Sequence, residues 1–470
     1  MPARHPDNDG IPQEPAWFSM RSVWGLIWVW ACVALGPCAV AGEVMVGAAR
    51  VDITPSTPIR LAGYVARKTE STGAHGKLWA KALAIGSGSK AVVWVTVDNC
   101  GVCSNVTEEV ARRLERKRGL ARARVVISST HTHSAPWIVG FAPNIFAEDL
   151  PESQVASVER YTREVTDAVE RVALGALEDR RPLRLSWMQG AVGFAANRRT
   201  AGGPVDHSVP VLVARERSGA VRAVLANYAC HCTTLGAGFN QTCGDWAGFA
   251  QEALETRYAG AVAMVSVGCG ADSNPNPRGG ADHGLGYSMR YGQTLAAEVE
   301  RLVGGKGVDL SGPPRCEFRT LDLPFQPHFT REQWETRSTQ PGIVGYHARR
   351  NLGRLERGES LPRALKFPVQ TWQFGDRLAV VFLGGEVVVD YALRFKRELK
   401  AEKLWITAYA NDVPCYIPSK RVLAEGGYEA LDSLWYYDRP APLGPEIEDL
   451  IVGGVQGMVS SRYRVKAGGR

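Results

Sequence analysis

The chain has 470 residues, of which 45% are hydrophobic and 22% charged, and it carries a formal net charge of +7. These proportions are those of an ordinary globular protein with a sizeable core. The charge excess is mild and no nucleic-acid-binding motif accompanies it. Composition therefore argues against a nucleic-acid-binding function and leaves room for peripheral contact with an anionic lipid surface.

The sequence at 1–41 predicts an N-terminal extension and an export signal. Residues 20–43 read MRSVWGLIWVWACVALGPCAVAGE, with a basic residue, an apolar stretch and the small-residue sequence AVA at 39–41. This order is typical of a secretory signal peptide that is cleaved after Ala41. The apolar stretch is short for a membrane-spanning helix, and no later segment is apolar enough to cross a bilayer. We therefore expect a secreted or periplasmic protein, without a transmembrane segment after signal removal, whose residues 42–470 form one large domain.

Hairpins and amphipathic helices follow one another along the rest of the chain. Turn residues between apolar runs predict β-hairpins at 78–98, 209–228 and 369–383. Helical periodicity is present at 107–118, 153–177, 245–257, 287–303, 345–357 and 387–400, with a stripe of Val155, Val158, Val165, Val169 and Val172 in the second. The mixture predicts an α/β fold with mixed β-sheets and flanking helices.

Five groups of polar residues each follow a predicted strand. They are His131 with His133, then His231, the segment 270–275, Glu386, and the group Asn411, Asp412 and Tyr416. The two histidines in SSTHTHSAP (128–136) are two residues apart, and such side chains lie on one face of a strand. Because ligands of open α/β sheets gather outside the carboxyl ends of strands, we expect all five groups to converge.

Two imidazoles, a carboxylate and an open position are what a catalytic Zn²⁺ requires, and the water it binds ionises near neutral pH. Turn capping explains any one of the five groups alone, but it does not explain all five together. Asp98 and Asp245 are candidates for orienting the ligand imidazoles, and Asp245 is equally well placed as a helix N-cap.

The cysteines after the signal are Cys100, Cys103, Cys230, Cys232, Cys243, Cys269, Cys316 and Cys415. Some could pair in an oxidising compartment, but the sequence does not give the connectivity. Cys230 and Cys232 flank His231 and point to the opposite face of an extended strand. We expect them to be core residues or half of a disulfide, and not metal ligands.

Several segments of the chain resemble the neutral/alkaline ceramidase family. The resemblance runs in order from about Val46 to about Leu431 and is carried by VGAARVDITP (46–55), GYVARKTESTGAHGKLWAKAL (63–83), SSTHTHSAP, NYACHCTTLG (227–236), GDWAGFA (244–250), GCGADSNP (268–275), and the region from NDVPCYIP (411–418) to GGYEA (426–430). Members are secreted, zinc-dependent hydrolases of the amide bond in N-acylsphingosines.

The resemblance implies one Zn²⁺ per chain, with the ligands His131, His231, Glu386 and Tyr416. It also implies that His133 lies beside the metal, where it polarises the substrate or steadies the bound water. Arg198 and Tyr428 fall on positions that face the reacting amide, where a guanidinium and a phenol stabilise an oxyanion. For Tyr428, a packed aromatic is an equally open interpretation.

One departure from the family concerns the nucleophile. The family segment reads GDVSPN and its serine is treated as catalytic, whereas residues 271–276 read ADSNPN. Asn274 holds the place of the serine, and Ser273 comes one residue early. We favour direct attack by the metal-bound hydroxide, with Asn274 orienting the substrate through a hydrogen bond. A reshaped turn that lets Ser273 act stays open.

A second departure lies at the end of the chain. Full-length ceramidases carry a C-terminal immunoglobulin-like domain, which needs roughly 100 residues. The sequence ends at Arg470, and the stretch after Tyr428 is well short of that length. We therefore expect a ceramidase-like catalytic domain without the immunoglobulin-like domain.

The leading hypothesis is an exported zinc amidohydrolase that cleaves a ceramide-like N-acyl amide, with His133 as the proton carrier because its ordinary pKa is near neutrality. A hydrolase of a non-ceramide amide or ester is one alternative. A second alternative is a TIM-barrel metal-dependent hydrolase, which also ends a strand in His-x-His. The predicted hairpins argue against it, because a TIM barrel alternates parallel strands with helices. The third alternative is not an enzyme in the full sense: it is a catalytically weakened, ceramidase-like protein that binds lipid or glycan.

Overall fold

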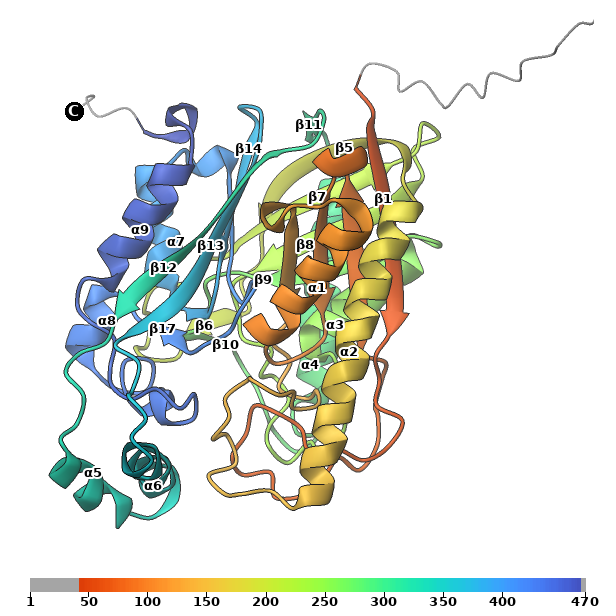
Figure 1. Ribbon diagram of the computed structural model, residues 1–470. Helices are drawn as coiled ribbons and strands as arrows, with labels where there is room; N and C mark the ends of the chain where they lie inside the picture. Colours follow the sequence, from red (N-terminus) through yellow and green to blue (C-terminus); the bar gives the residue numbers. More distant parts are fainter. Residues whose placement is uncertain (1–41, 466–470) are drawn as a thin grey trace, which may run out of the picture. The chain divides into compact units, whose positions relative to one another are not determined.

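The structure, a computed structural model, describes residues 42–465, and most of their strands belong to one large mixed sheet (Figure 1). Its strand order is β4 (Val125–Ser129), β3 (Val92–Val97), β2 (Trp79–Ile85), β1 (Val44–Asp52), β5 (Arg181–Ala191), β7 (Ser208–Arg215), β8 (Val221–Tyr228) and β9 (Val262–Val267), with β11 (Val308–Leu310) added to β5. The β3–β4 and β8–β9 pairs at the two ends are parallel, and the pairs between them are antiparallel.

A smaller sheet packs on one face of the large sheet. It consists of β12 (Arg315–Pro324), β13 (Ala364–Phe374), β14 (Leu378–Leu383) and β16 (Leu404–Thr407), in that order. Trp94 of β3 contacts Phe382 and Trp405 of the smaller sheet, with ring centroids 4.7 and 5.5 Å apart. Rings packed in this way add to the stabilisation that burial of their area gives. The aromatic side chains therefore hold the two sheets face to face.

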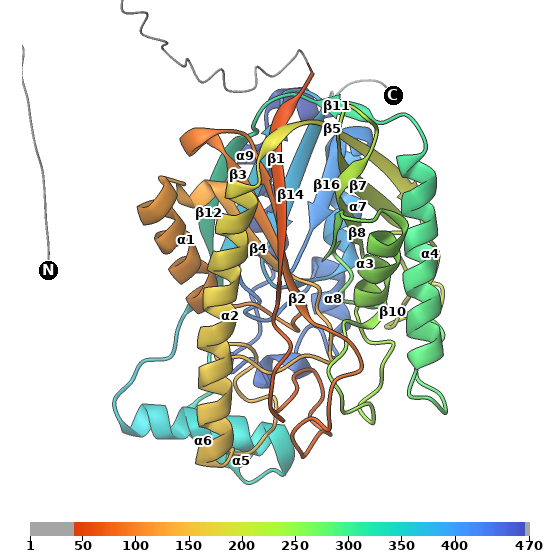
Figure 2. The same cartoon turned by 90° about the vertical axis from the view of Figure 1, so that its right-hand side faces the viewer.

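Helices cover the outer faces of both sheets (Figures 1 and 2). On the large sheet lie α1 (Ser104–Arg118), α2 (Glu152–Glu178), α3 (Asp245–Arg257) and α4 (Leu285–Val303), and on the smaller sheet lie α7 (Val389–Glu398) and α9 (Ile447–Met458). The helices α5 (Arg331–Ser338) and α6 (Gly342–Glu356) pair with each other between β12 and β13 in sequence, and α8 (Lys420–Glu425) follows β17 (Tyr416–Ile417). The result is a four-layer arrangement of helix, sheet, sheet and helix.

The predicted α/β class, the three hairpins and the six helices are confirmed, with small shifts at the element ends. The prediction that Val155 belongs to the valine stripe is wrong, because Val155 lies in the first turn of α2 and is 37% exposed. The predicted signal peptide lies outside the described residues. None of the helices within 42–465 is long and apolar enough to cross a membrane.

Two short strand pairs lie beyond the carboxyl ends of the sheet strands. In the first, β6 (Ala195–Asn197) pairs with β10 (Ser273–Pro275), and in the second, β15 (Glu386–Val387) pairs in parallel with β17. The second register places Glu386 directly opposite Tyr416. Backbone pairing therefore brings two of the predicted metal ligands side by side.

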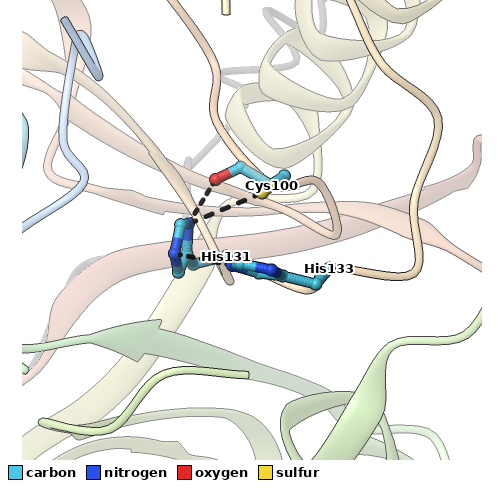
Figure 3. Close-up of side chains that lie close together, drawn as sticks. All are labelled: Cys100, His131 and His133. Atoms are coloured by element: carbon cyan, nitrogen blue, oxygen red, sulfur yellow. Dashed lines mark hydrogen bonds between the residues drawn. The ribbon is translucent and has the colours of Figure 1, made fainter. Parts of the chain in front are cut away.

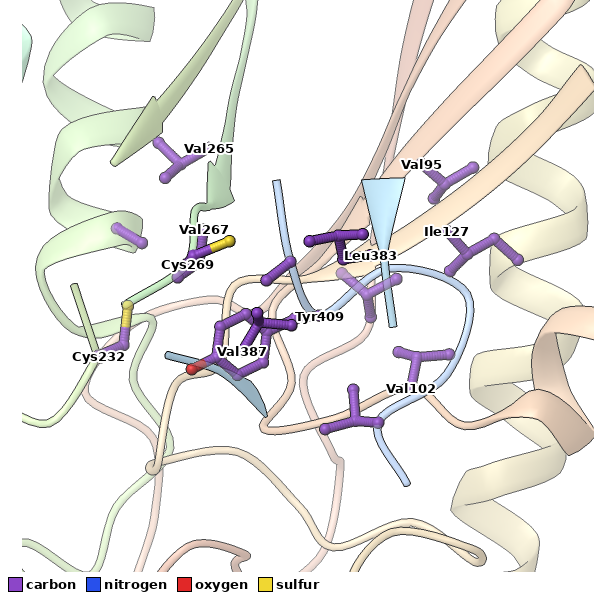
Figure 4. Packing of buried hydrophobic residues seen from close by; sticks show 14 of the residues in the cluster. Val95, Val102, Ile127, Cys232, Val265, Val267, Cys269, Leu383, Val387 and Tyr409 are labelled. Atoms are coloured by element: carbon purple, nitrogen blue, oxygen red, sulfur yellow. The ribbon is translucent and has the colours of Figure 1, made fainter. Parts of the chain in front are cut away.

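Buried apolar side chains pack next to the two short strand pairs. Figure 4 shows them around Tyr409, with the sulfur atoms of Cys232 and Cys269 among them. The eight cysteines at 100–415 are all free thiols in the described chain. Cys230 and Cys232 are fully buried in this core, which confirms the core interpretation over the disulfide.

Candidate active site

The four predicted metal ligands meet at one point beyond the strand ends. His131 follows β4, His231 follows β8, and Glu386 and Tyr416 begin β15 and β17. The Glu386 Oε2 atom lies 3.2 Å from His131 Nε2 and 3.1 Å from His231 Nε2. His231 Nε2 lies 3.2 Å from the Tyr416 hydroxyl. All four side chains are buried, so segments that are far apart in sequence enclose one small space.

Backbone carbonyl groups fix both imidazole rings. The Nδ1 of His131 lies 2.6 Å from the carbonyl oxygen of Cys100, and the Nδ1 of His231 lies 2.9 Å from that of Gly270. A carbonyl oxygen only accepts, so each Nδ1 carries the proton and each Nε2 presents its lone pair to Glu386. The expectation that Asp98 and Asp245 orient the ligand imidazoles was wrong, because the two backbone carbonyl groups orient them.

The approach of His131 and His133 differs from the expected strand geometry. β4 ends at Ser129, and His131 has a left-handed backbone with φ of 58°. Such a conformation is strained for a non-glycine residue and occurs preferentially at functional sites. The two Nε2 atoms nevertheless lie 3.1 Å apart. A turn at His131, and not strand alternation, brings the two rings together.

The donor set fits a zinc ion. Three lone-pair atoms, the Nε2 of His131, the Nε2 of His231 and the Oε2 of Glu386, face one another without a proton between them. Zn–N and Zn–O bonds of about 2.0–2.1 Å place neighbouring ligands of a tetrahedron about 3.3 Å apart. The separations of 3.1 and 3.2 Å found here are close to that edge. Two imidazoles, a carboxylate and a phenol are also ligand types that suit Zn²⁺.

Cys100 comes close to His131 but does not belong to this donor set. Figure 3 shows the carbonyl oxygen and the sulfur of Cys100 on the same edge of the His131 ring. The sulfur lies 3.9 Å from Nδ1, the protonated nitrogen, whereas His133 lies at Nε2. Burial also raises the pKa of the Cys100 thiol well above its ordinary value. The thiol and His133 therefore cannot share one ion through His131.

Glu386 is held in one orientation by contacts at both carboxylate oxygens. Its Oε2 faces the Nε2 atoms of His131 and His231. The Tyr437 hydroxyl donates a hydrogen bond to the other carboxylate oxygen, Oε1. The sequence does not mark Tyr437, because only the folded chain brings it to Glu386.

A cavity of about 800 Å³ opens onto the donor set and is lined by His133, Arg198, Asn274, Tyr416 and Tyr428, among others. Arg198 donates to the Tyr416 hydroxyl at 3.2 Å and to Glu429 at 2.7 Å. Burial opposes the charge of Arg198, but Tyr416 and Glu429 together raise its pKa well above the ordinary value. A permanent positive charge therefore lies beside the donor set.

Ser273 and Asn274 occupy different environments. Ser273 is fully buried, its hydroxyl has no hydrogen-bond partner within residues 42–465, and its carbonyl oxygen accepts from the His231 amide at 3.0 Å. Asn274 lines the cavity, and its Oδ1 accepts from the Thr233 hydroxyl at 3.2 Å. Of the two, only Asn274 faces the space that a substrate would enter.

Three predicted features of the site differ in detail. Burial and the neighbouring His131 and His231 rings lower the pKa of His133 well below its ordinary value, so His133 is neutral at pH 7. Asn411 and Asp412 do not reach the cavity. Asn411 instead bonds the amide of Ile127, and Asp412 accepts from the amide of Ser104.

Comparisons with known proteins find relatives of this chain in sequence and in fold. A neutral ceramidase from Oryza sativa subsp. japonica is 31% identical over 119 residues, which cover 23% of this chain and 15% of the rice protein. A ceramidase complexed with C2 superposes with a TM-score of 0.68 at 18% identity, over 91% of this chain and 77% of the other. The neutral ceramidase from Pseudomonas aeruginosa gives 0.67 at 20% identity, over 91% and 76%. These two structures share the fold.

The family model described as neutral/alkaline non-lysosomal ceramidase, N-terminal, matches residues 44–286. This range contains β1 to β10 and two of the four predicted ligands, His131 and His231. Because the match covers more than half of the chain, the protein belongs to the neutral/alkaline non-lysosomal ceramidase family.

Proposed function

We propose that the protein is a zinc-dependent hydrolase that cleaves the amide bond of an N-acylated lipid of the ceramide-like class. The observation that carries the proposal is the convergence of His131, His231 and Glu386, in which Glu386 Oε2 lies within 3.2 Å of the unprotonated Nε2 atom of each histidine. When bound, Zn²⁺ supplies a Lewis acid that polarises the carbonyl group and acidifies water. Family membership supports the reaction class.

The cavity residues supply the remaining requirements of amide hydrolysis. Water adds its oxygen to the acyl carbon, the C–N bond breaks with its electron pair on nitrogen, and the amine takes up a proton. The Arg198 guanidinium and the Tyr428 hydroxyl line the cavity, where they stabilise the charge that develops on the carbonyl oxygen. We assign proton transfer to His133, which is neutral before the reaction: its Nε2 takes a proton from the attacking water and then gives that proton to the leaving amine.

We assign the role of nucleophile to water and not to a serine. The burial of Ser273 and its absence from the cavity lining support this choice. Asn274 then orients the substrate, since its amide group can donate to the carbonyl oxygen while Thr233 holds its own oxygen.

We also propose export, because residues 20–43 have the order of a secretory signal. N-terminal sequencing of the protein recovered outside the cytoplasm should give a chain that begins at Gly42. Recovery of the intact N-terminus inside the cell contradicts this part of the proposal.

The function is tested by metal analysis together with turnover of a fluorescent short-chain N-acylsphingosine. We expect one zinc per chain, release of the fatty acid, loss of activity on chelation and recovery when Zn²⁺ is restored. His231→Ala should lose both zinc and activity. Zinc binding without turnover of any N-acyl amide or ester would favour the ceramidase-like binding protein instead.

A further inference from the structure

The cavity lining combines aromatic rings with polar and charged side chains. Among its residues within 42–465, none has an aliphatic side chain, and the rings are those of His133 and three tyrosines, Tyr64, Tyr416 and Tyr428. Burial of each methylene group contributes about 0.8 kcal/mol, so long hydrocarbon chains gain little from such walls. The cavity therefore suits a substrate whose groups next to the amide are polar.

The lining carries one positive charge that no carboxylate balances. Arg198 and Arg199 each form an ion pair with Glu429, and Arg199 also pairs with Glu425. Arg278, in contrast, forms no ion pair within residues 42–465, and its one side-chain hydrogen bond goes to the Thr233 hydroxyl at 3.1 Å. A guanidinium has five N–H donors, so most of those of Arg278 are available.

The unbalanced charge lies next to the residue that replaces the family serine. Thr233 accepts from Arg278 and donates to Asn274, so the three side chains form a short chain along one wall. Glu425 and Glu429, in the 425–429 segment of the lining, are paired with Arg198 and Arg199. The guanidinium of Arg278, which has no ion pair in the described chain, is therefore the group on the lining that a negative group can bind.

We propose that Arg278 binds a carboxylate on the amine half of the substrate, so that the preferred amides are N-acyl amino acids. This inference rests on the proposed amide hydrolysis and assigns an amino acid, in place of a sphingoid base, as the amine half of the preferred substrate. In an N-acylglycine the carboxylate carbon is two bonds from the amide nitrogen. An amide group held at Asn274 therefore places its carboxylate within reach of Arg278, and arginine pairs with carboxylates through two parallel hydrogen bonds. Hydrolysis adds water across the C–N bond and releases a fatty acid and an amino acid.

The test compares two amides that differ only in this charge, N-hexanoylglycine and N-hexanoylethanolamine, with the zinc-loaded protein. We expect kcat/KM for the glycine compound to be about ten- to a hundredfold higher, the range of a hydrogen bond between charged groups. In Arg278→Gln this ratio should fall towards one, mainly through KM, and Arg278→Lys should keep part of it. Arg290→Gln is the matched control, since Arg290 is an exposed arginine of α4 outside the cavity.

Equal turnover of the two amides, or a ratio that Arg278→Gln leaves intact, would overturn the proposal. If neither amide is cleaved, turnover of the N-acylsphingosine decides whether the hydrolase function fails, and calorimetry tests the carboxylate site separately. Binding of N-hexanoylglycine to the wild type that weakens at least tenfold in Arg278→Gln still supports the carboxylate site. No difference in binding between these two proteins contradicts it.

Discussion

Glu386 makes contacts through both of its carboxylate oxygens. Oε2 faces the imidazoles of His131 and His231, and Oε1 accepts the hydrogen bond from Tyr437. Groups behind metal ligands orient them and typically change metal affinity 10–100-fold. The phenol of Tyr437 therefore orients the Glu386 carboxylate, although Tyr437 is not itself one of the predicted metal ligands.

Tyr437→Phe should weaken zinc binding by about 10–100-fold, because the carboxylate loses the donor that fixes its orientation. Competition with a chelator of known affinity measures the effect. Tyr436→Phe, at the neighbouring position, is the control, since its hydroxyl makes no contact with the site in the described part of the chain. Unchanged affinity in Tyr437→Phe would show that Glu386 is oriented by other contacts.

Ser273 and Asn274 offer a second pair of variants. Ser273→Ala removes a buried hydroxyl without a partner in the described chain, so kcat/KM should stay within about threefold. Asn274→Ala removes a cavity amide and should lower kcat/KM about tenfold, the effect of one hydrogen bond. The reverse order, with Ser273→Ala inactive and Asn274→Ala active, would make Ser273 the nucleophile.

At the scale of elements, sequence patterns predicted whatever depends on local periodicity. The hairpin β13–β14 and the helix α3 follow from turn residues and amphipathic spacing, which neighbours in sequence determine. The pairs β15–β17 and β6–β10 have two or three residues per strand and carry no period. They form because the sheets bring distant segments together. The convergence of Glu386 and Tyr416 was expected from the strand ends and from the family resemblance, but their direct pairing was not.

Gly385 shows how strongly the fold constrains β15. Its φ is 74°, and an added Cβ would lie 2.7 Å from Ile417 Cγ1 and 2.9 Å from the Cys415 carbonyl oxygen. Gly385→Ala should therefore lower the free energy of unfolding by about 2–4 kcal/mol and weaken zinc binding at the adjacent Glu386. Urea unfolding and chelator competition measure the two effects.

Gly375→Ala is the control, since Gly375 has a φ of 58° with nothing near its added Cβ. It should cost about 1 kcal/mol from backbone strain and leave zinc affinity unchanged. Equal losses of stability and of zinc affinity in the two variants would show that the packing around Gly385 does not position Glu386.

At the scale of the whole molecule, buried neutral histidines make stability depend on pH. Burial lowers the pKa of His231 and of His347 to about 4, while a histidine in the unfolded chain titrates near 6.5. Between these values the unfolded state binds more protons, so stability falls as pH falls from about 6.5 towards 4.

The free energy of unfolding of the metal-free protein should fall by about 2 kcal/mol for each of these two histidines between pH 7 and pH 5. His347 lies away from the donor set, so His347→Gln should remove about half of the fall. Urea titrations at the two pH values measure it. A free energy that is the same at both would contradict the neutral, buried state of these rings.

The four-layer fold agrees with family membership, and the donor set opens onto a cavity in which Arg278 has no ion pair in the described chain. Sequence patterns predicted the strand ends where the ligands lie, but not which wall of the cavity carries charge. That property depends on how Arg198 and Arg199 pair with Glu429, and these are contacts between segments that lie far apart in sequence. Pairing of this kind has no signature in sequence.

X-ray absorption spectroscopy of the zinc-loaded protein tests the central claim most directly. We predict nitrogen and oxygen ligands at about 2.0–2.1 Å, with the multiple scattering of two imidazoles, from His131 and His231. His231→Ala should lose the metal, so that the purified variant gives no zinc absorption edge. A sulfur ligand at about 2.3 Å, or a shell of six oxygen atoms without imidazole, would contradict the account.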